Sequence, residues 1–347
     1  MQVKFLNNQI KAQHFRGVPP SEIMVPYPNI NSLLESQANF YKDKIFIKIE
    51  NEEMSYIDFY KKVNQYSNYL NKKKIKKNLF SVSNSNPILF LVEIFSVWNN
   101  GGVVDLDCEI EKKLNFEKIF KDFKPNFSPN KKNKFYDICI KINGRQKNKI
   151  FLSHYNLLIT AMGMSKNFNS KYENFFVYQY PFKEKLNMIL AIILALYLGN
   201  SLEFIKKNRE INSKNKTTLF SEQYYSNNKI ENIILPHNIK INHKHKNFRI
   251  GLFLPEVSGY ASINIKKPKI HLDNFFSIGK GMNHCELSIF NKNGSVVSNN
   301  IGELVVRGHN IVQRIEGDDC IENHFKFGWF HTGIKGIKFN NEFFIKL

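Results

Sequence analysis

The chain has 347 residues, 42% of them hydrophobic, so it can bury a large core, and this composition excludes a disordered protein. It exceeds one ordinary domain, and its formal net charge of +20 would attract nucleic acid, anionic lipid or a phosphorylated small ligand. Because the lysines are scattered and no basic stripe alternates with aromatic residues, a solvated basic surface explains the charge better, and no specific nucleic-acid partner is predicted.

Strand and helix periods alternate from the N-terminal side. Residues 45–50 alternate as a half-buried strand does, and Ser55 with Asp58 resembles a capping box that opens a helix. The apolar run 79–83 leads through Asn86-Pro87 into a buried helix, which an NNGG segment ends before the VVDLD strand. A strand, helix, strand unit in one sheet implies parallel strands and a right-handed crossover.

The same alternation continues in the middle of the chain. Strands are predicted over 136–142, 175–181, 201–205 and 249–256, and helices after the capping residue Ser153 and over 188–199. The run 188–199 is too short to span a bilayer and ends in a glycine, so it predicts a buried helix and no transmembrane segment. The polar stretch from about Lys207 to Lys229 has no clear period.

The pattern becomes rich in strands after Asn274. CELSIFNKNGSVVS predicts a hairpin with Asn293-Gly294 at its turn, IGELVVRG a further strand, and FGWFHTGIKG a glycine-rich turn. We therefore expect an α/β body followed by a β-rich subdomain.

Cysteine spacing bears on the compartment. Cys108, Cys139, Cys285 and Cys320 lie far apart and form no C-x-x-C pair, which argues against a zinc site or a disulfide framework. The N-terminus has no apolar core of signal-peptide type. Together these features predict a protein of the reducing cytoplasm.

Several of these segments together resemble the adenylate-forming superfamily, which contains acyl-CoA synthetases, aryl-CoA ligases, luciferases and adenylation domains. The segments are VPYPNINSLLESQANFYKDKIFIK, NGGVVDLD, FLSHYNLL, LFLPEVSG, IGELVVRGHNIV and FGWFHTG, in that order over nearly the whole chain. The resemblance implies an α/β, acyl-CoA synthetase-like large domain: two doubly wound subdomains at 1–170 and 171–273, and a β-rich, distorted-barrel subdomain at 274–347. We expect the small C-terminal domain of the family to be absent.

The resemblance also implies a reaction and its reagents. Members of the family join a fatty or aryl carboxylic acid to ATP, with magnesium, and then transfer the acyl group to coenzyme A. On this basis Glu256 is the candidate catalytic residue and magnesium ligand. The candidate nucleotide-binding residues are Gly144, Lys147, Lys149, Ser258, Thr332 and Gly333.

The segment KINGRQKNKIFLSH stands where the family has its glycine-rich phosphate loop. It keeps only Gly144 and has no Ser or Thr before the capping Ser153, so few backbone and hydroxyl donors remain for a phosphate. Arg145, Lys147 and Lys149 could hold a polyanion by charge alone. Two interpretations stay open: a solvated basic turn or a working phosphate loop.

Ile334 stands where the TGD motif of the family carries the aspartate that accepts the ribose hydroxyls. Hydrogen bonds to a charged group contribute about 1.5–3 kcal/mol each, so losing two should weaken nucleotide affinity about a hundred-fold to several thousand-fold. Lys335 is a donor only and does not replace the aspartate. In PFKE, Glu184 falls where the family has a substrate-side histidine, which a charged helix start explains.

These departures leave two classes of function. One is a degenerate relative of AMP-forming ligases, a pseudoenzyme with weak or no catalysis that serves as a binding or scaffold subunit. The other is an active acyl-CoA ligase half of fatty acid metabolism, completed by a separate C-terminal domain. A third interpretation, binding of nucleic acid or membrane, rests on charge alone. We expect any carboxylate or nucleotide ligand between the end of 249–256 and FHTGIKG, at the carboxyl ends of parallel strands.

Overall fold

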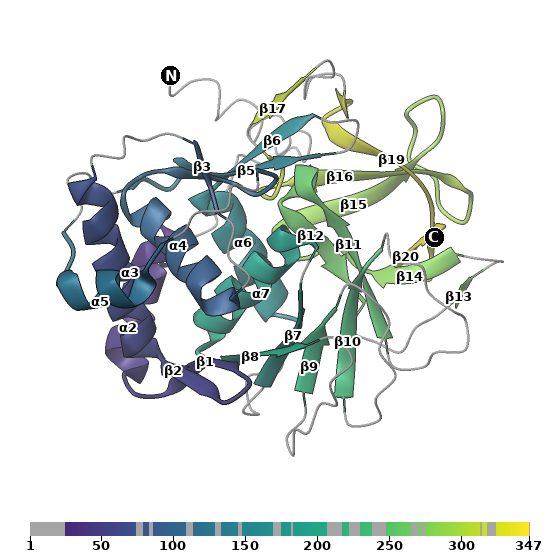
Figure 1. Ribbon diagram of the computed structural model, residues 1–347. Coiled ribbons are helices and arrows are strands. Elements are labelled where there is room, and N and C mark those ends of the chain that lie inside the picture. Colours follow the sequence, from purple (N-terminus) through teal and green to yellow (C-terminus); the bar gives the residue numbers. More distant parts are fainter. Residues whose placement is uncertain are drawn as a thin grey trace.

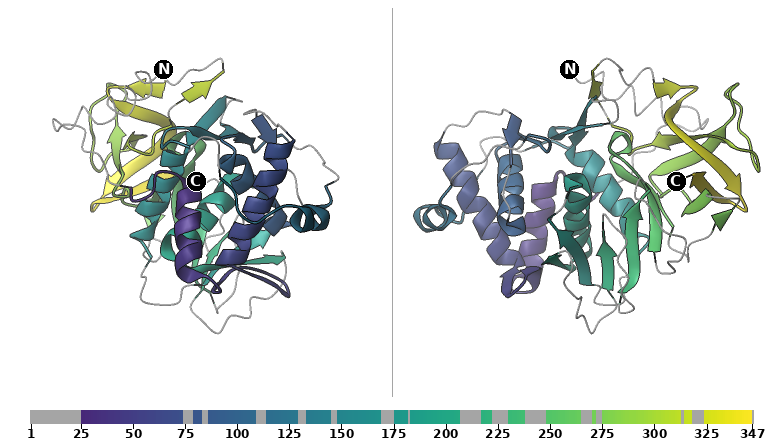
Figure 2. Two further views of the ribbon diagram at one scale, coloured as in Figure 1. Left: turned by 90° about the vertical axis from the view of Figure 1, so that its left-hand side faces the viewer. Right: turned by 45° about the vertical axis from the view of Figure 1, so that its right-hand side comes forward.

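Helices gather on one side of the molecule and the C-terminal strands on the other, as the computed structural model shows (Figure 1). Figure 2 shows the same separation from two further directions. The described residues are 25–73, 79–82, 86–108, 114–128, 133–144, 148–168, 175–181, 183–206, 217–221, 230–237, 248–264, 270–271, 275–312, 314–317 and 324–346.

A five-stranded sheet has the order β17-β6-β5-β4-β3. Its members are β3 (Leu79–Ser81), β4 (Val103–Asp105), β5 (Ile138–Asn143), β6 (Lys149–Ser153) and β17 (Arg314–Glu316). β3 and β4 pair in parallel, which confirms the crossover predicted around α4 (Pro87–Asn99). β5 and β6 form an antiparallel hairpin, and β6 is a strand that the sequence pattern does not indicate.

An eight-stranded sheet has the order β12-β11-β10-β9-β7-β8-β1-β2. Its members are β1 (Ile45–Ile49), β2 (Glu52–Ser55), β7 (Phe175–Tyr180), β8 (Ser201–Lys206), β9 (Thr217–Phe220), β10 (Ile230–Pro236), β11 (Phe248–Leu254) and β12 (Gly259–Ile263). Its inner strands are parallel, and β2 and β12 pair antiparallel at its two edges. β1 and β2 come from the predicted first subdomain; the boundaries at 170 and 273 stay a prediction.

A seven-stranded antiparallel sheet forms the β-rich part, in the order β13-β14-β20-β19-β16-β15 with β18 beside β19. Its members are β13 (Ile270–His271), β14 (Phe275–Gly279), β15 (Cys285–Phe290), β16 (Gly302–Gly308), β18 (Phe325–Lys326), β19 (Trp329–Phe339) and β20 (Glu342–Lys346).

Several helices begin at residues whose side chains cap them. The helices are α2 (Ile30–Tyr41), α3 (Tyr56–Lys72), α4, α5 (Phe116–Asp122), α6 (His154–Ser165) and α7 (Lys185–Leu198). The Ser55 hydroxyl accepts the N–H of Asp58 at the start of α3, and Ser153 forms a reciprocal capping box with Asn156 on α6. Gly199 ends α7 in the left-handed conformation, with φ of 69°. The predicted caps and the glycine stop are therefore confirmed.

The main core lies between the five-stranded and eight-stranded sheets. α6 contacts β6 on one side and β12 on the other, and α7 packs on β7 and β8. Both helices are apolar nearly all round, as expected for helices that sheets and neighbouring helices cover on several sides.

Two predictions for the β-rich part need correction. Gly294, with φ of 77°, makes the predicted turn, and the N–H of Val297 donates back to the carbonyl of Ile289 beside an isolated bridge to Phe290. The return arm does not form a strand of its own, and β15 pairs along its length with β16. The FGWFHTGIKG segment is not a turn. It forms β18, a short connection and the long strand β19, and its left-handed Gly333 sits in a β-bulge opposite β16.

Candidate functional site

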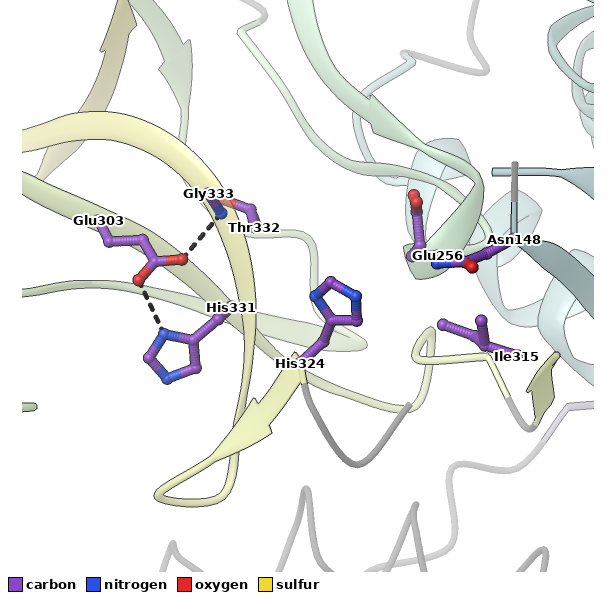
Figure 3. A pocket seen from close by; sticks show the side chains of 8 residues that line it. All are labelled: Asn148, Glu256, Glu303, Ile315, His324, His331, Thr332 and Gly333. Atoms are coloured by element: carbon purple, nitrogen blue, oxygen red, sulfur yellow. Dashed lines mark hydrogen bonds and ion pairs between the residues drawn. The ribbon is translucent and has the colours of Figure 1, made fainter. Parts of the chain in front are cut away.

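A cavity of about 190 Å³ lies where the β5–β6 hairpin, the end of β11 and the bulge of β19 meet (Figure 3). The described residues that line it are Asn148, Glu256, Glu303, Ile315, His324, His331, Thr332 and Gly333. The location agrees with the predicted cleft between the end of β11 and the FHTGIKG segment. Binding at that cleft stays a prediction.

Glu256 lies in a short helical turn, η2 (Pro255–Val257), directly after β11. It is 5% exposed, and its carbonyl oxygen accepts the N–H of Val312 at 3.1 Å. Ser258, two residues further on, has φ of 61°, and its hydroxyl donates to the carbonyl of Asn310 at 2.5 Å. The Asn310 amide in turn donates to the carbonyl of Val257 at 3.1 Å. These bonds fix the backbone that carries Glu256 against the segment that follows β16.

Gly144 directly follows β5 and lies beside this carboxylate. Its N–H donates to the carbonyl of Asn148 at 2.7 Å, which closes the β5–β6 hairpin. A Cβ atom at Gly144 would lie 3.0 Å from Oε1 of Glu256, so the absence of a side chain lets the hairpin reach Glu256. Lys149 is exposed and does not line the cavity. Lys147 and Arg145 lie outside the described residues.

The bulge of β19 forms the opposite wall. The Thr332 hydroxyl donates to the carbonyl of Leu304 at 2.5 Å and accepts the N–H of Ile334 at 3.1 Å. The N–H of Gly333 donates to Oε1 of Glu303 at 2.8 Å, and Nδ1 of His331 lies 2.8 Å from Oε2 of the same carboxylate. The backbone donors of the bulge therefore serve the protein itself, and the group it presents to the cavity is a carboxylate.

Ile334 follows this bulge and is half-buried. It pairs with Leu304 across the two strands, and its side chain packs against the main core. An isoleucine side chain offers a ligand no hydrogen bond, so this position contributes packing only.

The structure brings together part of the predicted site. Glu256, Thr332 and Gly333 line one cavity, with Gly144 beside it, whereas the side chain of Ser258 is committed to a backbone bond. Five lining residues are not among those predicted from the sequence: Asn148, Glu303, Ile315, His324 and His331. For Glu303 the sequence does hold a signal, because this acidic residue begins a strand whose later residues are buried. A charged side chain in that position is a candidate for the solvent-facing side of the strand.

The described residues offer few ligands for magnesium. Among the described residues no three His, Cys, Asp or Glu side chains form a group that could hold a metal ion. Magnesium is commonly held by one or two carboxylates together with substrate phosphates and water. Glu256 fits as one such ligand, and a complete protein site is not present in the described ranges.

Among the described residues, no helix combines the length and the apolar character that crossing a bilayer requires. Cys108 and Cys139 are free thiols, and Cys320 lies outside the described residues.

The sequence matches no protein-family model and no curated protein. The structure resembles solved adenylate-forming enzymes. A long-chain-fatty-acid-CoA ligase from Archaeoglobus fulgidus matches with a TM-score of 0.73 at 14% identity, over 94% of this chain and 85% of that chain. The N-terminal subdomain of NpsA from Klebsiella oxytoca, in complex with 3-hydroxybenzoyl-AMSN, gives 0.74 at 11%, over 92% and 99%.

A third solved structure carries a reaction intermediate in its name. The anthranilate CoA ligase AuaEII, in complex with anthranoyl-AMP, matches with a TM-score of 0.73 at 12% identity, over 93% of this chain and 77% of that chain. At these identities the likeness is one of fold, and it confirms the predicted α/β large-domain architecture.

Proposed function

We propose that this chain, which has the fold of the large N-terminal domain of adenylate-forming enzymes, binds an acyl-adenylate-like ligand but activates carboxylic acids weakly or not at all. The observation that carries the proposal is the cavity itself. Glu256, Thr332 and Gly333 come from two separate parts of the chain and line one space, with Gly144 from a third beside it. Such convergence of polar groups in one cavity is typical of a ligand site.

Weak or absent catalysis follows from three features of that cavity. Ile334 offers no acceptor beside the bulge, and the N–H of Gly333 is already bound to Glu303. Glu256 is the single candidate magnesium ligand, and among the described residues no group of three His, Cys, Asp or Glu side chains could hold a metal ion. A site that binds the adenylate but does not stabilise the charge that develops on phosphate transfer binds the ground state without accelerating the reaction.

The proposed ligands are those of the fold neighbours. NpsA and AuaEII are described with adenylate-type ligands, so a carboxylate joined to an adenylate is the proposed occupant of this cavity. ATP, magnesium and coenzyme A would be reagents only if catalysis remains. The free thiols of Cys108 and Cys139 support the proposed location, which is the cytoplasm.

A second candidate function is an acyl-CoA ligase half that a separate C-terminal domain completes. The share of each neighbour's chain that this chain spans supports this alternative. This chain spans 99% of the NpsA N-terminal subdomain but 85% of the Archaeoglobus ligase and 77% of AuaEII. The neighbours that are ligases thus contain parts that this chain does not match.

Binding and catalysis can be measured separately on the purified chain. Titration calorimetry with a non-hydrolysable acyl-adenylate analogue reports binding, and carboxylate-dependent exchange of pyrophosphate into ATP reports activation. Binding without exchange, weakened by Glu256→Ala and unchanged by Glu286→Ala, is the expected result. Glu286 is the control because it pairs with Arg307 and does not line the cavity.

Three outcomes would contradict the proposal. Rapid exchange that Glu256→Ala abolishes would mean that the site still activates acids. Exchange that appears only when a C-terminal domain is supplied as a second chain would favour the alternative. If no adenylate analogue binds to the chain, the ligand site itself is rejected.

A further inference from the structure

A second cavity, of about 410 Å³, lies among the N-terminal helices. Its walls come from the start of α2, from α3, from the last residue of α4 and from the segment that follows α5. These helices lie on the side of the molecule away from β15 and β16 (Figure 1). No described residue lines both this cavity, which we call the helical cavity, and the one that contains Glu256.

The lining of the helical cavity is polar and almost uncharged. Among its described residues, five are asparagines and two are serines, and Glu35 is the only charged side chain. No lysine or arginine is among them, although the whole chain carries a net charge of +20. An anionic ligand would therefore find no cation to pair with in this described lining, and an apolar ligand would bury polar groups without partners.

Two helix ends reach the helical cavity and oppose one another. α2 begins there, and the side chain of its cap Asn29 accepts the N–H of Ser32 at 2.8 Å. α4 ends there at Asn99. The positive end of one helix and the negative end of the other have effects of similar size. The carboxylate of Glu35 therefore decides the sign of the charge in the described part of this space.

Two of the asparagines offer their amide oxygens to a ligand. Nδ2 of Asn99 donates to the hydroxyl of Ser67 at 3.1 Å, and that hydroxyl donates to the carbonyl of Val63 at 2.7 Å. Nδ2 of Asn133 donates to the carbonyl of Trp98. Because these partners accept, they fix which side of each amide is the oxygen. Neither oxygen has a hydrogen-bond partner among the described residues, and both side chains are half-buried.

Glu35 is joined to these amides by a chain of hydrogen bonds. The Tyr60 hydroxyl donates to the carboxylate of Glu35 and accepts from the side chain of Asn64. Burial raises the pKa of Tyr60, and Glu35 raises it further, so the hydroxyl keeps its proton. Oδ1 of Asn64 in turn lies 3.4 Å from Nδ2 of Asn99. The donors of this chain are thus bonded within the protein, and lone pairs on Glu35 remain for a ligand.

We propose that the helical cavity binds the primary ammonium group of a small amine, which donates to Glu35 and to the amide oxygens of Asn99 and Asn133. An ammonium group has three donors and no acceptor, which matches a lining whose open groups mainly accept. The rings of Tyr60 and Phe127 line the same space, and the faces of such rings attract cations. The inference does not depend on the proposed function, because the two cavities share no described lining residue.

The first measurement compares three small probes on the natural whole chain by ligand-observed NMR titration. Ethanolamine carries the ammonium group, ethylene glycol replaces that group by a neutral hydroxyl, and choline keeps the charge but has no N–H donor. Ethanolamine should bind about ten-fold more tightly than either of the others, because hydrogen bonds to charged groups are the strong ones. The side-chain amide resonances of Asn64 and Asn99 should shift as ethanolamine is added, which locates the site.

The second measurement uses Glu35→Gln, which keeps the shape of the side chain and removes its charge. Glu35 is exposed, so solvent screens its charge, and ethanolamine affinity should fall about two- to five-fold. The affinity of ethylene glycol should not change. Glu117→Gln is the matched control, because Glu117 is an exposed glutamate on the neighbouring helix α5 that does not line the cavity. It should leave all affinities unchanged.

Four outcomes would overturn the inference. Equal affinities for ethanolamine and ethylene glycol would mean a site for neutral hydroxyl compounds. Equal affinities for ethanolamine and choline would mean attraction by charge without hydrogen bonds to the amide oxygens. Binding that moves neither amide resonance and ignores Glu35→Gln would lie elsewhere on the molecule, and no binding of any probe would reject the site. The adenylate proposal stands or fails separately, by its own titration.

Discussion

Gly144 follows β5 of the five-stranded sheet, Glu256 follows β11 of the eight-stranded sheet, and the two residues lie close together: a Cβ atom at Gly144 would be 3.0 Å from Oε1 of Glu256. The same Cβ would be 2.3 Å from Cδ1 of Ile150, on the returning strand of the hairpin. A side chain at this position would therefore have to displace the end of the Ile150 side chain and press on the carboxylate of Glu256.

A methyl group at this position should destabilise the fold. We expect Gly144→Ala to lower the free energy of unfolding by about 1–3 kcal/mol, since overpacking forces the neighbours to shift. Ile150→Val removes the Cδ1 atom that meets the new methyl, so the double variant should lose less than the sum of the two single variants. Urea unfolding of the four proteins of this double-mutant cycle measures the coupling.

Additive losses in that cycle would mean that Ile150 is not the obstacle. The remaining contact is then the carboxylate of Glu256, which the combination of Gly144→Ala with Glu256→Ala tests in the same way. If neither of the two double-mutant cycles shows coupling, the close approach of the hairpin to Glu256 is contradicted.

The buried histidine His284 makes stability depend on pH. Burial, and then repulsion by His309, lower its pKa from 6.5 to about 3. As the pH falls, the unfolded chain takes up this proton before the folded chain does. The contribution of neutral His284 to the free energy of unfolding is therefore fully present above pH 6.5 and is lost as the pH falls toward 3. The loss amounts to at most about 1.4 kcal/mol per pH unit.

A comparison of slopes checks this prediction. His284→Leu removes the titrating group and two ring nitrogens that have no hydrogen-bond partner among the described residues. The free energy of unfolding, measured in urea from pH 8 to pH 5, should fall less steeply for the variant than for the natural chain. Parallel curves below pH 6.5 would show that His284 does not carry the acid sensitivity.

Local patterns in the sequence predict much of the fold. The caps at Ser55 and Ser153, the left-handed Gly199 and the parallel pairing of β3 with β4 each depend on a few adjacent residues or on a regular period. β6 escapes prediction because its short apolar run directly precedes the capping Ser153 and is too brief to show a period.

The site is predicted less completely, because its walls depend on pairing between distant residues. A glycine with positive φ occurs in turns and in bulges alike, so Gly333 alone does not distinguish them. The distinction comes from β16, where Glu303 lies across from the bulge. The hydrogen bond from Gly333 to Glu303 follows from that pairing, and no local sequence motif predicts it.

Removing one partner of a buried ion pair on the five-stranded sheet should lower the free energy of unfolding more than removing both partners. Nζ of Lys141 lies 2.6 Å from Oδ2 of Asp105, and their side chains are 16% and 6% exposed. Lys141→Met should cost about 3–5 kcal/mol, because it leaves a buried carboxylate without its cation. Replacing both, by Lys141→Met with Asp105→Leu, should cost less than either single change.

The exposed pair of Lys48 with Glu53 is the matched control. It has a similar distance, 3.0 Å, but exposures of 34% and 48%. Solvent screening should reduce the effect of Lys48→Met to about 0.2–1 kcal/mol. Equal losses at the two sites in thermal or urea unfolding would contradict the importance of burial for the Lys141 pair.

The hydroxyl of Thr332 should fix the bulge on which the cavity depends. It is 1% exposed, donates to the carbonyl of Leu304 and accepts the N–H of Ile334. Thr332→Val keeps the shape but leaves both backbone groups unsatisfied, so it should lower the free energy of unfolding by about 1–3 kcal/mol. Thr332→Ser keeps the hydroxyl and should cost clearly less. Amide exchange at Gly333 and Ile334 locates the effect: faster exchange in the valine variant but not in the serine variant is expected. Equal exchange in both would mean that the bulge is held by Glu303 alone.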